Sequence, residues 1–345
     1  MRKEAFAYTG AERAASLLNG GLRRIASLGL GSAKKGQPLV VFNPSSWART
    51  DLVRVFVPER SLDTPDLDLV DSASGERIPA IFEPQTNPNH RPRGRFIRFL
   101  ARDVPPVGYA RYELVPANKG QTGAKAAESN GIDSDALSLT VDLPSATIAS
   151  LIDRASGENL VADGPLGFNG YVYDRYASAP GFNHLSSRIG ASGLWLLGSR
   201  GTSAYGLVTA RESNDVWERL KLRYSGDGAD WLETTLTLPH GTSRLHIENR
   251  LHKPATMTKE SVYFAFPFNA DAESLTFEIT GGVATAQSPH VPGSARHFRA
   301  IRHWATLQGA TSIAWATTEA PLVQVGNIHL PYAPFETTID PDDAH

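Results

Sequence analysis

The sequence predicts a mainly β protein with one N-terminal helix, a small antiparallel β-domain and then a large β-sandwich. Three observations support this fold class. Apolar residues recur every three or four positions only near the N-terminus, which is the period of one helix face. Short apolar or alternating segments separated by turn residues fill the rest of the chain, as is typical of antiparallel strands. A stretch poor in large apolar residues, 117–134, divides these strands into two groups and is expected to be a linker.

The helix is expected at about residues 5–28. Its apolar face consists of Ala7, Ala11, Ala14, Leu18, Leu22 and Ile25. Gly20 and Gly21 each weaken it by about 1 kcal/mol relative to alanine, so it is expected to need a packing partner. We therefore interpret residues 1–36 as the end of a helical bundle followed by a linker.

The small β-domain is expected at residues 37–116. Its first strand, 39–42, ends at Asn43-Pro44, because proline lacks a backbone donor and biases the preceding residue away from the helical region. Trp47 follows this turn and is expected to close the end of a sheet. Further strands are predicted at 52–57, 67–70, 78–82, 95–100 and 109–115. With no helical period between them, these strands are expected to pair antiparallel.

The large domain is expected at residues 135–345 as a two-sheet sandwich. Strands are predicted at 137–143, 147–153, 170–176, 193–197, 204–211, 217–224, 231–238, 244–251, 261–266, 275–279 and 311–316. The segment 232–238 alternates between apolar and polar residues, so one of its faces is expected to be buried and the other solvated.

Composition excludes several classes of function. A net charge of −2 with mixed signs gives no basic stripe for nucleic acid. The absence of cysteine excludes disulfides, thiolate metal sites and cysteine nucleophiles. No run of about 18 apolar residues and no signal-peptide core occur, so we expect a cytoplasmic protein without a membrane partner.

Three stretches resemble family 38 glycoside hydrolases, the α-mannosidases. Residues 40–49, Val-Val-Phe-Asn-Pro-Ser-Ser-Trp-Ala-Arg, resemble the VVFNPLSWxR signature that opens the β-rich half of that family. Residues 103–112 are similar to its VPPLGYxxY stretch, and residues 148–158 to its GxIxSLxDKxSGRE stretch. They occur in the family's order, and the resemblance extends over about residues 5–280.

The resemblance implies a terminal bundle helix, a small β-domain and a supersandwich like that of galactose mutarotase. It also implies that catalysis belongs to an N-terminal barrel that binds zinc and supplies an aspartate nucleophile. No alternating strand and helix pattern for such a barrel occurs here, so no zinc ligand or nucleophile is assigned to this chain. We expect the C-terminal β-portion of an α-mannosidase-like enzyme, inactive and without a cofactor by itself, whose partners are the missing barrel, the bundle and carbohydrate.

Residues 170–176 hold the first candidate site. Tyr171 and Tyr173 alternate and therefore share one face of a strand, with Asp174 beside them. The resemblance implies that a tyrosine from about this region reaches the edge of the barrel's sugar site, so these three residues are candidates for substrate contact. The alternative is that the rings pack in a core or an interface.

A polar cluster in the strand 244–251 is the second candidate. His246, Glu248, Arg250 and His252 are expected on one face, where two histidines and a carboxylate could hold a metal or transfer protons to a sugar. The alternative is a solvated face whose charges pair with Arg219, Lys221 and Arg223. Two other functions stay open: a stand-alone carbohydrate-binding sandwich and a mutarotase-like sugar epimerase.

Overall fold

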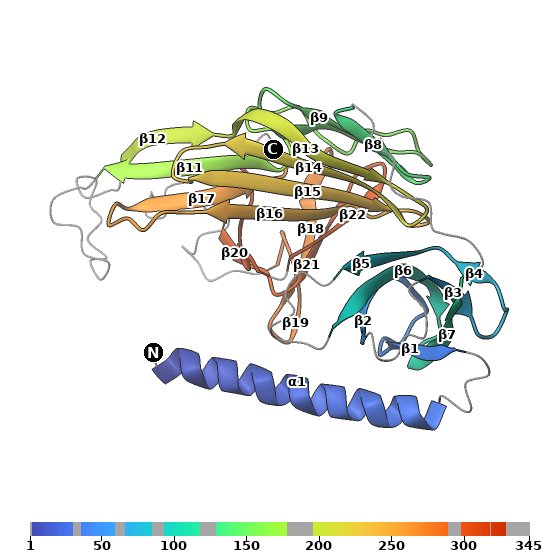
Figure 1. Cartoon of the computed structure of the whole chain (residues 1–345). Helices are drawn as coiled ribbons and strands as arrows, with labels where there is room; N and C mark the ends of the chain where they lie inside the picture. The colour runs from blue at the N-terminus through green and yellow to red at the C-terminus, as the bar shows by residue number, and fades with distance from the viewer. Residues whose placement is uncertain are drawn as a thin grey trace. The chain divides into compact units, whose positions relative to one another are not determined.

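The computed structural model describes residues 2–29, 36–58, 66–84, 93–117, 129–177, 196–288, 298–317 and 319–328. They belong to two compact units: residues 1–124 with 214–216, and residues 125–213 with 217–345. Within these described ranges, one helix is followed by strands alone, and the strand pairs are antiparallel (Figure 1). The predicted fold class, mainly β with an N-terminal helix, is confirmed.

The helix α1 (Arg2–Gly29) matches the prediction to within three residues at its start. Most of its apolar residues are exposed, with Phe6 at 78% and Leu17 at 79%. Nothing within the described residues is a helix long and apolar enough to cross a membrane. The helix therefore carries apolar side chains that the described residues leave open to solvent.

The first unit also contains two sheets. Its strands are β1 (Gln37–Asn43), β2 (Arg49–Pro58), β3 (Leu67–Asp71), β4 (Arg77–Ile78), β5 (Ala80–Pro84), β6 (Gly94–Val104) and β7 (Gly108–Pro116). One sheet has the order β1-β7-β3-β4 and the other β2-β6-β5. The core between them includes Leu69, Ile97, Phe99 and Leu114, all nearly inaccessible. Each strand predicted in this domain is found, and the segment 78–82 is divided between β4 and β5.

The second unit contains the remaining strands. They are β8 (Gly131–Asp133), β9 (Leu137–Asp142), β10 (Thr147–Asp153), β11 (Gly170–Ala177), β12 (Leu196–Thr202), β13 (Ala204–Ser213), β14 (Trp217–Ser225), β15 (Trp231–Pro239), β16 (His246–His252), β17 (Glu260–Ala265), β18 (Asp271–Ile279), β19 (Gly282–Thr285), β20 (Phe298–Ala300), β21 (Trp304–Gln308), β22 (Ser312–Ala316) and β23 (Leu322–Gln324).

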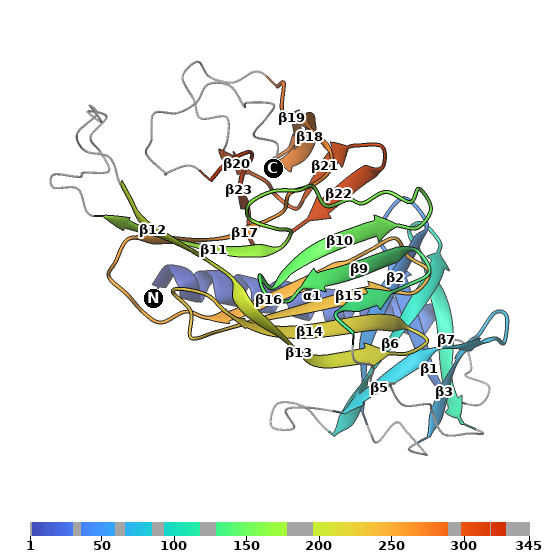
Figure 2. The same cartoon turned by 90° about the horizontal axis from the view of Figure 1, so that it is seen from above.

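Two layers of this unit enclose its main core. The sheet β10-β9-β8 lies over the sheet β13-β14-β15-β16, and the sheet β12-β11-β17 lies beside β16 (Figures 1 and 2). The core includes Leu139 and Ile148 from one layer and Leu220, Leu232 and Leu236 from the other. The buried face predicted for β15 is confirmed, since its leucines face this core. Its other face is not solvated as predicted, because Glu233 and Thr235 are half-buried and Thr237 is buried. A second core around Leu275 and Phe277 supports the sheet β19-β18-β21-β22.

Some sequence predictions need correction. The linker predicted at 117–134 ends earlier, because residues 131–133 form β8 and Ile132 is fully buried. The strands β19, β21 and β23 were not predicted, and all three have five residues or fewer. Trp47 does not close a sheet, because 64% of it is exposed. Residues 30–35, 85–92, 118–128, Trp195 and 329–345 lie outside the described residues.

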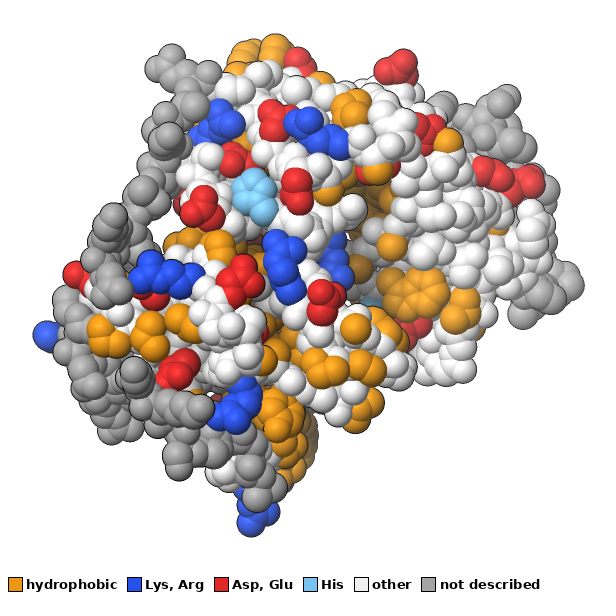
Figure 3. Space-filling view, turned by 90° about the vertical axis from the view of Figure 1, so that its right-hand side faces the viewer, with side chains coloured by type: hydrophobic (Ala, Val, Ile, Leu, Met, Phe, Trp, Pro, Cys, Tyr) orange, Lys and Arg blue, Asp and Glu red, His pale blue; other side chains and the backbone are white. Residues whose placement is uncertain are grey.

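Charges of both signs are mixed on the described surface. On the face shown in Figure 3, Lys and Arg side chains are interspersed with Asp and Glu side chains, and neither sign forms a continuous area. This arrangement agrees with the net charge of −2.

Candidate functional site

The predicted contact residues lie on β11, the central strand of the sheet β12-β11-β17. Tyr173 lies opposite Gly201 of β12 and Val262 of β17, and Asp174 lies opposite Arg200 and Ser261. Because alternate residues of a strand point to opposite faces, the two tyrosines project to one side of this sheet and Asp174 projects to the other. The shared face predicted for Tyr171 and Tyr173 is confirmed.

The two tyrosines belong to the main core. The Tyr171 hydroxyl donates a hydrogen bond to the carbonyl oxygen of Asp227 (2.7 Å), in the turn between β14 and β15. A Cβ at Gly226 would lie 2.8 Å from the Tyr171 ring, and one at Gly228 would overlap the Tyr173 ring. Glycine at both positions therefore lets this turn close over the two rings.

Tyr173 begins a series of polar contacts at the edge of the core. Its hydroxyl donates to Glu260 Oε2 (2.5 Å), and Glu260 also forms an ion pair with Lys253. The hydrogen bond to Glu260 raises the pKa of Tyr173. Burial opposes ionisation of Glu260, but the contacts with Lys253 and Tyr173 together lower its pKa. Burial raises the pKa of Tyr171 to about 12. Both phenols are therefore neutral hydrogen-bond donors at physiological pH.

The other face of β11 holds a buried ion pair. Asp174 accepts two hydrogen bonds from Arg200, from Nε and from Nη2, each of 2.7 Å. The Asp174 side chain is 1% exposed, whereas that of Arg200 is 31% exposed. The bond to Asp174 raises the pKa of the Arg200 guanidinium, which therefore keeps its charge. Two parallel bonds of this kind fix both side chains in one geometry.

Two more tyrosines extend this polar face. The Tyr176 hydroxyl lies 3.0 Å from Ser261 Oγ and 3.4 Å from the Tyr263 hydroxyl. Burial raises the pKa of Tyr176. With the Asp174–Arg200 pair, these side chains join all three strands through polar contacts. The arrangement can hold β11 rigidly and present neutral donors, but it contains no pair of free carboxylates for glycoside cleavage.

The predicted polar cluster does form one face of β16. His246, Glu248, Arg250 and His252 are all exposed and alternate with less exposed residues. Alternate residues of a strand lie about 6.6–6.8 Å apart, too far for the four side chains to converge on one ion. Across the described residues, no group of three or more His, Cys, Asp or Glu side chains is close enough to hold a metal.

The prediction that the charges of this cluster pair with residues of β14 is wrong. β15 lies between β14 and β16, so Lys221 of β14 reaches Glu233 of β15 (3.0 Å) instead of β16. The His252 ring lies against Trp231, and its Nδ1 is 2.7 Å from Asp230 Oδ2. A strand pattern does not state which strand comes next in a sheet, so the sequence could not identify these partners.

A second polar centre, which the sequence did not predict, joins two of the resembling stretches in the first unit. Asn43 Nδ2 lies 2.7 Å from the carbonyl oxygen of Trp47, 2.9 Å from that of Val104 and 3.1 Å from that of Pro105. The backbone N–H of Ser45 donates to Asn43 Oδ1 (3.0 Å). The buried Asn43 side chain thus links residues 40–49 to residues 103–112. The Asn-Pro turn was the only signal, and it did not indicate the distant partner.

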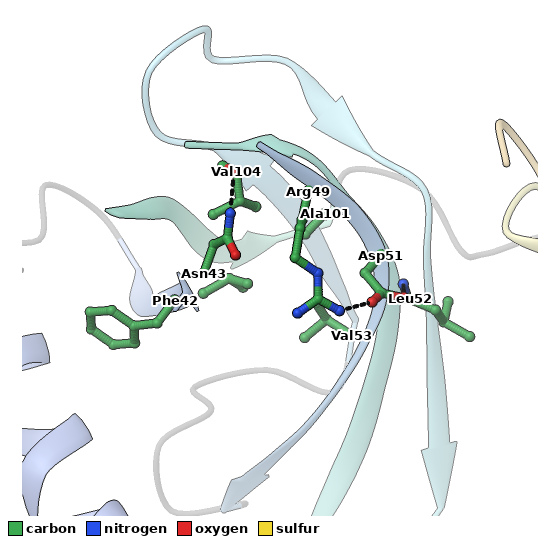
Figure 4. Close-up of a pocket in the computed structure, with 9 residues that line it drawn as sticks. Phe42, Asn43, Arg49, Asp51, Leu52, Val53, Ala101 and Val104 are labelled. Atoms are coloured by element: carbon green, nitrogen blue, oxygen red, sulfur yellow. Dashed lines mark hydrogen bonds and ion pairs between the residues drawn. The ribbon is translucent and has the colours of Figure 1, made fainter. Parts of the chain in front are cut away.

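A hollow of about 170 Å³ opens beside Asn43 (Figure 4). Its walls come from β1, β2 and β6 and include Phe42, Arg49, Asp51, Leu52 and Val104. Arg49 Nη2 donates to Asp51 Oδ2 (2.5 Å), and Asp51 Oδ1 accepts from the backbone N–H of Leu52 (2.9 Å). The hollow therefore combines apolar walls with one charged pair.

Comparisons with known proteins identify solved structures with a similar fold. No protein-family model matches the sequence, and no curated protein matches it. Among solved structures, an alpha-mannosidase from Enterococcus faecalis V583 is similar with a TM-score of 0.58 and 11% identity, over 85% of this chain and 39% of that chain. A glycosyl hydrolase family 38 protein from Enterococcus faecalis is similar with a TM-score of 0.54 and 12% identity, over 90% of this chain and 43% of that chain. The chain thus shares the fold of about two fifths of these structures.

Proposed function

We propose that this chain is the C-terminal β-portion of an α-mannosidase-like glycoside hydrolase and supports a zinc-dependent catalytic barrel formed by residues outside it. The observation that carries this proposal is the unequal coverage of the structural likeness. It extends over 85% of this chain but only 39% of the alpha-mannosidase chain, so most of that protein has no counterpart here. The three stretches that resemble the family support the same assignment.

The exposed apolar residues of α1 support the proposal that a partner outside the described residues packs against this helix. A helix in a folded protein owes most of its stability to packing of its apolar face, and α1 also contains the helix-weakening residues Gly10, Gly20 and Gly21. Leu17, Leu18 and Ile25 are among its exposed apolar residues. A second helical surface would cover them, which is what the end of a bundle requires.

The described residues do not fit a zinc centre, since none of their His, Asp and Glu side chains form a group able to hold a metal. No catalytic step is therefore assigned to zinc within this chain. In the proposal, β11 supports the sugar site. Tyr171 and Asp174 are fully buried and have defined partners, so we assign them a positioning role, and Tyr173 is the candidate of the three for direct contact.

Three measurements test the proposal. The purified chain should not hydrolyse 4-nitrophenyl α-D-mannopyranoside. The coding sequence on its 5′ side should encode a barrel with histidine and aspartate ligands, and co-expression of the two should give turnover that a chelator removes and zinc restores. Turnover by the chain alone that survives repurification and is lost in Glu260→Gln would overturn the assignment. A 5′ sequence without such a barrel would do the same.

A further inference from the structure

Two neighbouring turns at one end of the small β-domain form an exposed apolar surface. One turn follows β1, and the other joins β6 to β7. No residue in the ranges 44–48 and 105–109 is charged, and interface cores are likewise depleted of charge and enriched in Trp and Tyr. We name this surface the two-turn patch, and its exposed residues are Pro44, Trp47, Pro105, Pro106, Val107 and Tyr109.

Hydrogen bonds hold the two turns together. The buried Asn43 side chain binds the backbone of both turns, and the backbone N–H of Val107 donates to the carbonyl oxygen of Ser45 (2.8 Å). The Phe42 ring packs against Tyr109 at a centroid distance of 5.9 Å. The patch is therefore pre-organised, which lowers the entropic cost of covering it with a partner.

Val107 is an unfavourable residue for the chain by itself. Its φ of 46° lies in the left-handed region, which is costly for a β-branched residue and free of strain for glycine. Because Val107 is 78% exposed, its side chain gains little burial within this chain to offset that cost. Burial against a partner would supply the gain, so the strained and exposed valine indicates a contact surface.

The area of the patch determines the kind of partner. With Trp47 64%, Val107 78% and Tyr109 42% exposed, it presents on the order of 400 Å² of apolar surface, a size typical of functional patches. A stable complex of separate molecules buries about 800 Å² on each partner, so the patch alone is too small for a stable dimer. Another part of the same polypeptide can use a smaller contact, because the covalent link gives it a high effective concentration.

We propose that the two-turn patch is the surface on which the catalytic part of the same polypeptide docks. The identity of this partner rests on the proposed function, which places that part outside this chain. Apolar side chains of the catalytic part cover Trp47 and Val107 in the docked state. The exposed apolar side chains of α1 supply a second contact, so the patch does not have to hold the two parts together alone.

The test uses the absence of cysteine from this chain, which lets one introduced thiol report its own exposure. Trp47→Cys is labelled with a maleimide in this chain and in the polypeptide extended by its 5′ coding sequence, and mass spectrometry follows the peptide that contains the thiol. Labelling should be at least about tenfold slower in the extended polypeptide. Tyr205→Cys, at a residue of the second unit that is 83% exposed, is the control and should react equally in both.

A second substitution separates docking from folding. Val107→Gly removes the side chain and relieves the positive φ, so the melting temperature of this chain should not fall. In the extended polypeptide it should speed the labelling of Trp47→Cys about threefold or more, because docking loses a buried contact. Tyr205→Gly is the matched control, since Tyr205 is also exposed and has a φ of 58°, and it should leave that labelling unchanged.

Each outcome decides the inference. Slower labelling of Trp47→Cys in the extended polypeptide, weakened by Val107→Gly but not by Tyr205→Gly, supports it. Equal labelling in an extended polypeptide that hydrolyses the mannoside overturns it and leaves the proposed function intact, as does protection that Val107→Gly does not change. An extension without a catalytic barrel overturns both. Labelling of this chain alone that slows as its concentration rises also overturns the inference, because a second copy then covers the patch.

Discussion

Replacing Arg200 with methionine tests whether the buried ion pair fixes β11. The substitution removes both 2.7 Å bonds and leaves Asp174, 1% exposed, without its cation. Breaking a buried pair in this way costs about 3–5 kcal/mol. Asp174→Asn should cost less, about 1–2 kcal/mol, because Arg200 is 31% exposed and can turn towards water while the amide oxygen still accepts one bond. The two substitutions of one pair should therefore differ by about 2 kcal/mol.

The assay is urea unfolding at pH 7.0, followed by far-ultraviolet circular dichroism and tryptophan fluorescence, with the transition of the second unit fitted separately. The matched control is Arg154→Met, which removes a 2.7 Å pair with Asp133 whose side chains are 45% and 58% exposed. An exposed pair contributes about 0–1 kcal/mol, so this variant should be nearly neutral.

Equal losses in Arg200→Met and Asp174→Asn would refute this reasoning, because the asymmetry follows from the difference in exposure. A loss below about 1 kcal/mol in Arg200→Met would show that the pair behaves like a surface pair.

Three further predictions concern other parts of the chain. Asn43→Ala should destabilise the first unit by about 2–4 kcal/mol in thermal melts, because the carbonyl groups of Val104 and Pro105 lose their side-chain donor; Ser45→Ala, which keeps the backbone N–H, is the control. In hydrogen exchange, α1 amides of the purified chain should exchange orders of magnitude faster than those of β14 and β15, since its apolar face is exposed; equal protection would contradict the proposal of a missing helical partner. The raised pKa of Tyr171 means that the stability contributed by its neutral form is complete below pH 10 and is lost as the pH rises to about 12. Alkaline unfolding should therefore become less steep in Tyr171→Phe, and an unchanged curve would show that Tyr171 is accessible to solvent.

The sequence predicted those elements whose side chains repeat with a regular period. The strand 231–238 was found because Leu232, Leu236 and Leu238 alternate with polar residues and all face one core. The helix was found for the same reason, although its apolar face is exposed. By contrast, β8 has only three residues and lies in a stretch of Asn, Gly and Asp, so it has no period to detect.

The candidate site was predicted less completely. Alternation indicated correctly that Tyr171 and Tyr173 share a face, but not that the face is a core. Arg200 lies 26 positions from Asp174 and Glu260 lies 87 from Tyr173, so these partners depend on the order of strands in the sheet. Periodicity carries no such information.

Two of the three stretches that resemble the mannosidase family contain polar residues that shape turns. Asn43 in the first stretch binds the backbone of the second. In the third, Asp153 Oδ2 accepts from the Ser156 hydroxyl (2.7 Å), a bond that lowers the pKa of Asp153, and Gly157 has a φ of 77° that completes the turn. Residues that fix turns specify a fold whatever the chemistry of the whole protein. For that reason the resemblance identifies a scaffold, and chemistry has to be sought in groups such as Tyr173 and Glu260, which the scaffold holds but the turns do not require.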